Sequence, residues 1–498
     1  MNREQAITPT VDQRADRARS KSRRRVLRLT AVQLAVVGAG VVLVRLVLDL
    51  GASTATSIGS VGGPTASTAS AGHGDLLAKV LLAALVVVAV ARGTGAVALR
   101  IGQPRVVGEI VGGFLLGPTV LGAVAPGASA WLVPPDALPA LDAFAQLGLV
   151  LFMFLVGLEL DPALVRRQGH RSAVLSNVGM VVPFTFGVGI ALVLHPAFGN
   201  GVAFAPFALF LGASMAITAF PVLAAILTER DLAQRPLGSL ALTCAAVDDV
   251  TAWFLLAAVV ALVRATSPAD AALTGALAVG FALVMIVAVR PLLRGLVSRF
   301  MPDERVTPGA IALVVVGLLA SAWTTETIGI HAIFGAFMFG AVLPLRMPVV
   351  HALHARIGTL TSVLLLPAFF AATGLHTDLW AVAGDPRAAW GAFGLIMLGA
   401  VGGKLGAISV TARSLGMTWR DSTALGVLMN TRGLTELVIL GIGLQLGAIP
   451  HELYGLLVVM ALVTTAATTP LLAVILPSTR SSRRPVAVSD PAASARFL

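Results

Sequence analysis

The sequence predicts an all-α polytopic membrane protein, and three observations support this fold class. The 498 residues are 57% hydrophobic and only 12% charged, a composition too apolar to cover a soluble globule. Apolar runs of about 18–25 residues recur along most of the chain, which is the length of a membrane-crossing helix. These runs are continuous rather than alternating, so helices are favoured over a β-barrel.

The net charge of +11 raises the question of a nucleic-acid partner. The basic residues instead cluster in alternate loops and in both tails, as at Arg23–Arg25 and Arg483–Arg484, which is the positive-inside pattern. Arg264 and Arg387 are exceptions, in loops assigned to the outside. We therefore expect no nucleic-acid partner. We expect a multi-pass protein of the plasma membrane, in contact with the lipid bilayer, with both termini in the cytoplasm.

Fourteen transmembrane spans follow from the apolar runs and from the loops between them. Each is an apolar stretch that ends near charged residues, proline or glycine, and basic loops fall at every second boundary. In chain order the spans cover residues 29–48, 75–97, 106–123, 143–160, 173–195, 203–228, 237–263, 271–290, 308–325, 329–345, 359–376, 388–412, 421–446 and 452–476.

The two ends of the chain lie outside this repeated pattern. Residues 1–74 are expected to hold a basic cytoplasmic tail, an extra span and a flexible external linker rich in Ser, Thr, Ala and Gly. The same pattern fits a cleaved signal peptide, but Arg45 interrupts the far end of the apolar run, which favours an uncleaved helix. Residues 477–498 are expected to be a short cytoplasmic tail.

Cysteine and histidine patterns give no sign of a metal centre or a cofactor. Cys244 is the single cysteine, so an intramolecular disulfide is impossible, and no Cys/His spacing fits a zinc site. We therefore expect no cofactor.

Asp248 and Asp249 are the most informative residues, because they lie roughly 18 Å into the span 237–263. A charge at that depth is costly and requires a partner, a cavity or a proton. Successive residues of a helix point about 100° apart, so the two carboxylates cannot share one small site symmetrically. We expect a division of roles, in which one binds a cation or protons and the other pairs with a basic residue. The simpler alternative is a solvated pair at a helix end.

Lys404 is the expected basic partner of one of these aspartates. It lies deep in the span 388–412, where a lysine needs an acidic partner or must lose its proton. Snorkelling to the membrane surface is the alternative, but the position is central in the span.

Two spans carry signals of interruption. Pro221 lies inside the span 203–228 and is expected to kink or break it. The span 421–446 contains residues of low helix propensity and two charged residues at mid-depth. Broken helices at membrane depth are tolerated around protein-lined cavities, where half-helix ends supply partial charges. The expected lining residues are Ser214, Thr218 and Pro221 in the first span and Asn430, Thr431, Arg432 and Glu436 in the second.

Arg432 has two possible roles in the second interrupted span. It can pair with Glu436 four residues further along the helix. Alternatively, it can compensate the negative end of the opposite half-helix.

The spans also predict an internal repeat. The fifth to seventh spans match the twelfth to fourteenth in order, and the middle member of each triplet is the interrupted one. The offset of seven spans is odd, so the two repeats are inverted. Inverted repeats with broken helices are typical of secondary transporters.

Other polar residues near span ends carry weaker predictions. Glu159, His331 and His376 are interpreted as interfacial. For Glu109, an interfacial position and a place in a cytoplasmic funnel are both open.

These residues resemble the monovalent cation:proton antiporter-2 family, in particular plant cation/proton exchangers and fungal potassium/proton exchangers. The resemblance extends over residues 75–476. The matching stretches are Gly102–Ala123, Leu147–Pro162, Ala216–Arg230, Ala246–Phe254, Gly329–Leu345 and Met429–Gly441.

The resemblance implies a sodium/proton-antiporter-like fold with inverted repeats and two crossed discontinuous helices. It also implies thirteen core spans beside the extra N-terminal one, a homodimer, and an elevator-like motion. Residues 75–160 and 308–376 would form the scaffold. Residues 173–263 and 388–476 would form the moving core, and residues 271–290 would link the two.

By the same resemblance, Asp249 is the shared site of the cation and the proton, and Asp248 pairs with Lys404. The hypothesis is therefore an antiporter, not an enzyme, that exchanges Na+ or K+ for protons. Thr218, Asn430 and backbone carbonyls would replace part of the hydration shell of the ion.

Two other functional classes are alternatives to an antiporter. An intramembrane aspartyl protease needs two aspartates that converge from separate helices, which adjacent residues on one helix do not do. A channel, or a proton-coupled transporter or efflux system for another small solute, stays open.

Overall fold

A computed structural model describes residues 73–159, 162–199, 201–265, 267–299, 307–343, 348–377 and 386–476, and these residues form helices and short connections without a β-strand. The all-α prediction is confirmed for this part of the chain. The predicted span 29–48 and the tail 477–498 lie outside the described residues, as does nearly all of the linker.

The helices of the first half largely follow the predicted spans. They are α2 (His73–Arg100), α3 (Arg105–Leu116), α4 (Leu121–Val124), α5 (Pro126–Leu132), the 3-10 turn η1 (Pro135–Ala137), α6 (Leu138–Glu159), α7 (Pro162–Phe198), α8 (Phe204–Ala216), α9 (Phe220–Glu229) and α10 (Pro236–Arg264). The predicted span 106–123 is shorter as a helix, because α3 ends at Leu116 before Gly117 and Pro118.

The second half contains three π-helical turns inside longer helices. Its elements are α11 (Pro268–Val284), η2 (Met285–Val289), α12 (Arg290–Arg299), α13 (Pro308–Ile328), α14 (Ala332–Val342), α15 (Pro348–Leu360), η3 (Thr361–Leu365), α16 (Leu366–Leu375), α17 (Pro386–Met397), η5 (Leu398–Gly402), α18 (Gly403–Ser414), α19 (Trp419–Met429), α20 (Leu434–Gln445) and α21 (His451–Ile475). The turn η5 ends two residues before Lys404.

Eleven of the described helical segments are long and apolar enough to cross a membrane, and the bent pair α19 and α20 makes a twelfth. The remaining predicted core span, 329–345, corresponds to α14, which has only 11 residues and is about 16 Å long. Each predicted core span therefore contains a helix. The number of membrane crossings stays a prediction.

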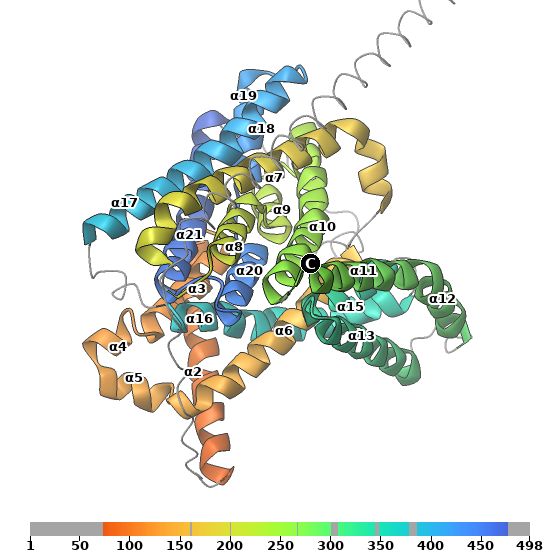
Figure 1. The fold of residues 1–498 in the computed structure, drawn as a ribbon. Coiled ribbons are helices and arrows are strands. Elements are labelled where there is room, and N and C mark those ends of the chain that lie inside the picture. The colour runs from red at the N-terminus through yellow and green to blue at the C-terminus, as the bar shows by residue number, and fades with distance from the viewer. Residues whose placement is uncertain are drawn as a thin grey trace, which may run out of the picture.

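Figure 1 shows how the helices group in space. Helices α7–α10 and α17–α21 lie together, whereas α2–α6 and α11–α16 lie along the other side. Within the second group α6 and α14 approach closely, because a Cβ atom on Gly340 would lie 2.2 Å from the carbonyl oxygen of Phe154. Small residues allow the same close contact between helices in other membrane proteins.

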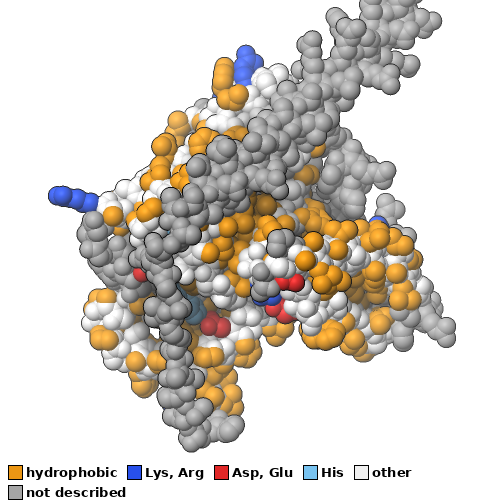
Figure 2. Space-filling model, viewed as in Figure 1, with side chains coloured by type: hydrophobic (Ala, Val, Ile, Leu, Met, Phe, Trp, Pro, Cys, Tyr) orange, Lys and Arg blue, Asp and Glu red, His pale blue; other side chains and the backbone are white. Residues whose placement is uncertain are grey.

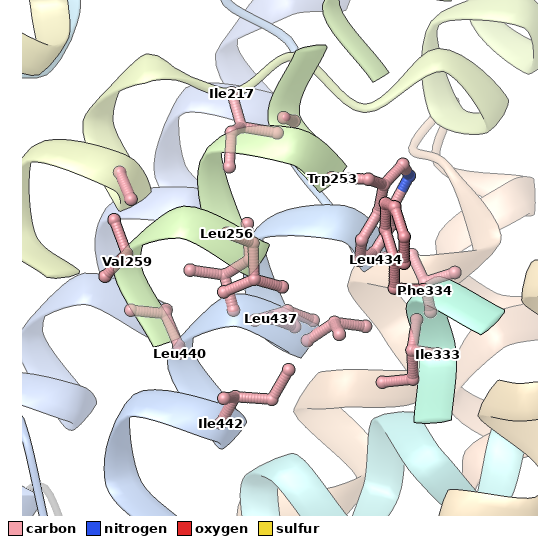
Figure 3. Close-up of a cluster of buried hydrophobic side chains, with 14 of the residues drawn as sticks. Ile217, Trp253, Leu256, Val259, Ile333, Phe334, Leu434, Leu437, Leu440 and Ile442 are labelled. Atoms are coloured by element: carbon pink, nitrogen blue, oxygen red, sulfur yellow. The ribbon is translucent and has the colours of Figure 1, made fainter. Parts of the chain in front are cut away.

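Apolar side chains cover much of the outer surface as well as the interior. Figure 2 shows large apolar areas on the face in view. Leu85 of α2, Val279 of α11 and Trp323 of α13 are more than half exposed. In water such a surface would be unstable, and in a bilayer it faces lipid tails. The interior cluster in Figure 3 joins α10, α14 and α20 through Leu256, Phe334 and Leu437.

Candidate functional site

The two aspartates lie on α10, whose 29 residues run without interruption. Asp248 is fully buried and Asp249 is 4% exposed. The alternative of a solvated pair at a helix end is therefore wrong for this structure. The two carboxylates contact different neighbours, as expected for successive residues of a helix.

Asp248 faces a complete set of donors. The hydroxyl group of Ser176 on α7 donates a hydrogen bond to its Oδ1, and the hydroxyl group of Thr218 donates to its Oδ2 at 2.8 Å. The Nζ atom of Lys404 on α18 lies 3.7 Å from Oδ2, and both side chains are fully buried. Lys404 does not snorkel. It also donates to the carbonyl oxygen of Ala216 at the end of α8.

Asp249 faces a much poorer set of donors. It accepts a hydrogen bond from the backbone N–H of Phe220, the first residue of α9. The hydroxyl group of Thr435 on α20 lies 3.5 Å from its Oδ1, at the limit of a hydrogen bond. Within the described part of the chain, Asp249 has no ion-pair partner.

The first break separates α8 from α9. Ile217 and Ala219 have extended backbones that flank Thr218, so the helix stops for about one turn. The predicted interruption at Pro221 is a break rather than a kink, and the proline lies on its C-terminal side. Pro221 lies in the first turn of α9, where its missing N–H group would have no partner in any case.

The second break separates α19 from α20 and contains no proline. Gly433 has φ +159° and ψ −130°, a conformation open essentially to glycine alone. A Cβ atom at this position would lie 2.7 Å from a methyl carbon of Val222 on α9. The two helices meet here at a bend of 42°.

The two breaks are joined by hydrogen bonds. The N–H of Ala219 donates to the carbonyl oxygen of Thr431 at 3.0 Å. The hydroxyl group of Thr218 also lies 2.8 Å from the carbonyl oxygen of Met429, and its single hydrogen serves either this carbonyl group or Asp248. Each break thus satisfies backbone groups that the other leaves without helical partners.

Arg432 fills both roles that the sequence left open. Its Nη1 atom is 3.1 Å from Oε1 of Glu436, and both side chains are buried. The same guanidinium donates to the carbonyl oxygens of Ser214 and Met215, at 2.9 Å for the latter. These are final carbonyl groups of α8, the negative end of that half-helix. The carbonyl oxygen of Ser214, rather than its hydroxyl group, therefore takes part in this contact.

Asn430 and Thr431 are buried with unused hydrogen-bonding capacity. Asn430 Oδ1 and Thr431 Oγ1 have no hydrogen-bond partner among the described residues, and neither has Oε2 of Glu436. The two side chains belong to the second break, beside the hydrogen bonds that join the breaks.

Sequence reasoning missed three hydroxyl residues of this region. They are Ser176, Thr435 and Thr465. The hydroxyl group of Thr465 donates to the carbonyl oxygen of Arg432 at 2.7 Å. Thr435 lies within the predicted Asn430–Glu436 motif and could have been included. Ser176 and Thr465 carry no comparable signal, because hydroxyl residues are common in apolar helices.

The weaker predictions have mixed outcomes. Glu109 is 3% exposed and lies 3.9 Å from Arg92 of α2, so it is buried rather than solvated at an interface. His331 and His376 lie at helix ends. The side chain of Glu159 lies outside the described residues.

Five buried charged residues surround the two breaks. The carboxylates of Asp248 and Glu436 are matched by Lys404 and Arg432, and the carboxylate of Asp249 is left over. A buried site with one unmatched negative charge suits one proton or one monovalent cation. The fold and the site together define a membrane transporter built around two broken helices.

The chain belongs to the sodium/hydrogen exchanger family, because residues 81–476 match the transmembrane region of that family. It is 38% identical over 406 residues to the Na(+)/H(+) antiporter NhaS4 of Synechocystis sp., which covers 81% of this chain and 98% of that relative. The predicted family is thus confirmed, and it is a transporter family rather than a class of enzymes.

Eukaryotic relatives are similar over part of their length. The chain is 40% identical over 377 residues to Cation/H(+) antiporter 19 of Arabidopsis thaliana, which covers 75% of this chain and 46% of the relative. It is 33% identical over 400 residues to K(+)/H(+) antiporter 1 of Saccharomyces cerevisiae, which covers 78% of this chain and 45% of the relative. The chain spans less than half of these two proteins.

A solved structure shares the fold. The sodium proton antiporter MjNhaP1 of Methanocaldococcus jannaschii matches with a TM-score of 0.57 and 14% identity, over 80% of this chain and 95% of that one. The described residues therefore have an all-helical fold of this kind, and the family match and the relatives above make the chain a member of a family of multi-pass cation/proton antiporters.

Proposed function

We propose that the protein exchanges Na+ or K+ for protons by alternating access at Asp249. One observation carries the proposal: Asp249 is the carboxylate at the breaks without a cationic partner, whereas Asp248 and Glu436 each have one. A matched carboxylate gains little from binding a further cation. The unmatched one gains an entire counter-charge.

The surroundings of Asp249 suit both ligands. The N–H group of Phe220 marks the positive end of α9, which stabilises the ionised carboxylate before a ligand arrives. Desolvation acts in the opposite direction and favours neutralisation by a proton or a cation. A proton and a small cation can therefore compete for the same oxygens.

The oxygens expected to replace the hydration shell need one revision. Thr218 lies beside Asp248 rather than Asp249, so it is a poor candidate for a ligand of a cation held by Asp249. Thr435 takes its place, because its hydroxyl oxygen lies beside Asp249. Asn430 stays in the proposed set, since its Oδ1 atom is buried and free to accept a cation.

Coupling follows from the cost of an unmatched charge. If the group of helices that carries Asp249 moves through the membrane interior, an empty site moves with a bare carboxylate. Loading by a proton or a monovalent cation removes that charge. If these helices move only when Asp249 is loaded, a cation carried in one direction is exchanged for a proton carried in the other. No further machinery is needed.

The arrangement of helices supports the proposed division into core and scaffold. Helices α7–α10 and α17–α21 correspond to the proposed core, and α2–α6 with α13–α16 to the scaffold (Figure 1). The same proposal includes inverted repeats, crossed broken helices and a homodimer. It also includes a plasma-membrane location and cytoplasmic termini. The choice between Na+ and K+ stays open, because the names of the relatives include both.

Reconstitution into proteoliposomes tests the proposal. A pH-sensitive dye inside the vesicles should report proton movement when Na+ or K+ is added, with Li+ as a comparison ion. Asp249→Asn should abolish this movement, whereas Asp231→Asn should not, because Asp231 is an exposed loop residue whose positive φ of 54° suits asparagine. Normal exchange by Asp249→Asn would reject Asp249 as the site. Proton movement without any monovalent cation would favour another solute.

A further inference from the structure

The connection between α13 and α14 has an unusual backbone. Gly329 ends α13 in the left-handed conformation, with φ +96°. His331, two residues later, has φ +80° and ψ 139°, although it is not a glycine. Such a conformation is sparsely populated and persists only where the surrounding contacts hold it in place.

Glu326 of α13 is the centre of those contacts. Its Oε2 atom accepts a hydrogen bond of 2.7 Å from the N–H of Ala332, the first residue of α14. Its Oε1 atom lies 3.8 Å from Nη2 of Arg264, the last residue of α10. One carboxylate therefore caps α14 and also contacts the helix that carries Asp249.

The imidazole of His331 lies next to this carboxylate without a hydrogen bond to it. Its Nδ1 atom is 4.0 Å from Oε2 of Glu326, which is beyond a hydrogen bond. Within the described residues, this buried atom has no hydrogen-bond partner. The charged groups that act on the ring are Glu326 and Arg264.

The elements packed beside this connection carry two further acidic residues. Asp270 is exposed in the first turn of α11, and Asp142 of α6 pairs with His376 rather than with this connection. Figure 2 shows acidic and basic side chains meeting on an otherwise apolar face close to the start of α11.

The contact joins two groups of helices that the proposed function requires to move relative to each other. Helix α10 belongs to the proposed core, and α13 with α14 to the proposed scaffold. Two aromatic contacts lie along the same boundary: Trp253 against Phe337 at 6.1 Å, and Phe254 against Phe334 at 5.5 Å between ring centroids. Figure 3 shows Trp253 of α10 beside Phe334 of α14. The aromatic contacts do not depend on charge, whereas the contact of Arg264 with Glu326 does.

We propose that Arg264, Glu326 and His331 form a proton-sensitive latch between α10 and the α13–α14 connection. The three are positioning residues, since their contacts are with one another and with the start of α14 rather than with Asp249, and the proposal rests on the proposed exchange function. With a neutral His331, Glu326 is free to hold Arg264. A protonated His331 competes for Glu326 and repels Arg264, so the latch weakens and the core moves more readily.

The effect should be modest, because Arg264 and Glu326 are partly exposed. Ion pairs of this kind change an equilibrium by about two- to fivefold. We therefore expect acidification on the side of this connection, assigned to the outside by the predicted topology, to raise the maximal exchange rate by about that factor.

Arg264→Gln and His331→Asn test the latch in proteoliposomes. Arg264→Gln removes the contact from the side of α10 and leaves the cap on α14 intact. His331→Asn removes the titrating group and introduces a residue that, like histidine, is among the non-glycine residues found most often at positive φ. The maximal rate and the KM for the cation are measured while the pH is varied separately on each side of the membrane.

We expect Arg264→Gln to raise the maximal rate by about two- to fivefold at neutral pH and to lose the response to acid on that side. His331→Asn should lose the same response while the KM stays unchanged. The latch would be overturned if both variants responded to acid on that side as the wild type does. It would also be overturned if the variants changed only the KM.

A cross-link provides a second measurement that does not depend on charge. Cys244 is the only cysteine, so Cys244→Ala gives a cysteine-free background, whose activity is measured first. Arg264→Cys with Glu326→Cys in this background is joined by a short, reducible bifunctional thiol reagent. Exchange should stop on cross-linking and return on reduction.

Continued exchange in the cross-linked protein would mean that α10 does not move against this connection, and the latch would be rejected. The proposed function would survive that result, provided that exchange still requires Asp249. Absence of exchange in the wild type would reject the proposed function instead.

Discussion

Two faces of α10 carry the same side chain in different surroundings. On one face, two hydroxyl groups and an ammonium group surround Asp248. On the other face, Asp249 has one backbone N–H and one hydroxyl group at 3.5 Å. The difference shows that burial alone does not identify a transport site. What separates the two aspartates is how far the protein itself satisfies the charge.

Replacement of the two aspartates should therefore change the free energy of unfolding by different amounts. Loss of one partner from a buried ion pair leaves the other charge uncompensated, which is strongly destabilising. Loss of an unmatched buried charge removes a desolvation penalty and no ion pair. Asp248 should therefore matter for stability, and Asp249 for exchange.

Substitution of each aspartate by asparagine tests this contrast most directly. Asp248→Asn leaves the ammonium group of Lys404 buried without a counter-charge and should destabilise the protein by about 3–5 kcal/mol. Asp249→Asn should leave the melting temperature unchanged or raise it. Thermal unfolding of the purified protein in detergent measures both.

Lys404→Met provides the matched control for the same pair. It should destabilise the protein to a similar extent as Asp248→Asn, and the double variant should be more stable than the sum of the two single effects predicts. Equal destabilisation by Asp248→Asn and Asp249→Asn, or strictly additive effects in the double variant, would remove the proposed contrast.

The hydroxyl groups that contact the aspartates should give a smaller effect of the same kind. Ser176→Ala removes a donor to a buried carboxylate and should cost about 1–3 kcal/mol of stability. Thr435→Ala should change stability little, because its contact with Asp249 is long, but should weaken the apparent affinity for the cation. Melting temperatures and the KM for Na+ or K+ in proteoliposomes measure the two outcomes. The reverse pattern would exchange the roles of the two aspartates.

The smallest expected effect involves an acid–histidine pair away from the breaks. His376 follows the end of α16, and its Nε2 atom is 3.3 Å from the carboxylate of Asp142 on α6. The hydrogen bond and the charge of Asp142 raise the pKa of His376 above its ordinary value of 6.5. The stability that this pair contributes is therefore fully present below pH 6.5 and is lost as the pH rises through the raised pKa.

Asp142→Asn should remove this dependence on pH. Melting temperatures of the wild type and the variant should differ most at acidic pH and converge as the pH rises. Because the side chains are about one third exposed, the difference should be small. A difference that grows with pH would contradict the assigned sign.

The broken helices show where sequence reasoning succeeded and where it stopped. Pro221 identified the segment of the first break, and the structure adds that extended residues just before the proline end α8. The low helix propensity around Gly433 predicted that the second span is interrupted, but not the backbone conformation through which Gly433 sets the break. The pairing of Arg432 with Glu436 was predictable from their spacing of four residues.

The sequence by itself determined that the chain is helical and apolar, that two aspartates lie deep in one helix, and that Lys404, Arg432 and Glu436 lie deep in others. These conclusions follow from composition and periodicity, which act within single segments. Only the tertiary structure decided that Ser176 and Lys404 meet Asp248, and that Asp249 is left unmatched. The reason is physical: hydrogen bonds and ion pairs depend on distances of a few ångströms between helices far apart in the chain, and helical periodicity does not encode these distances.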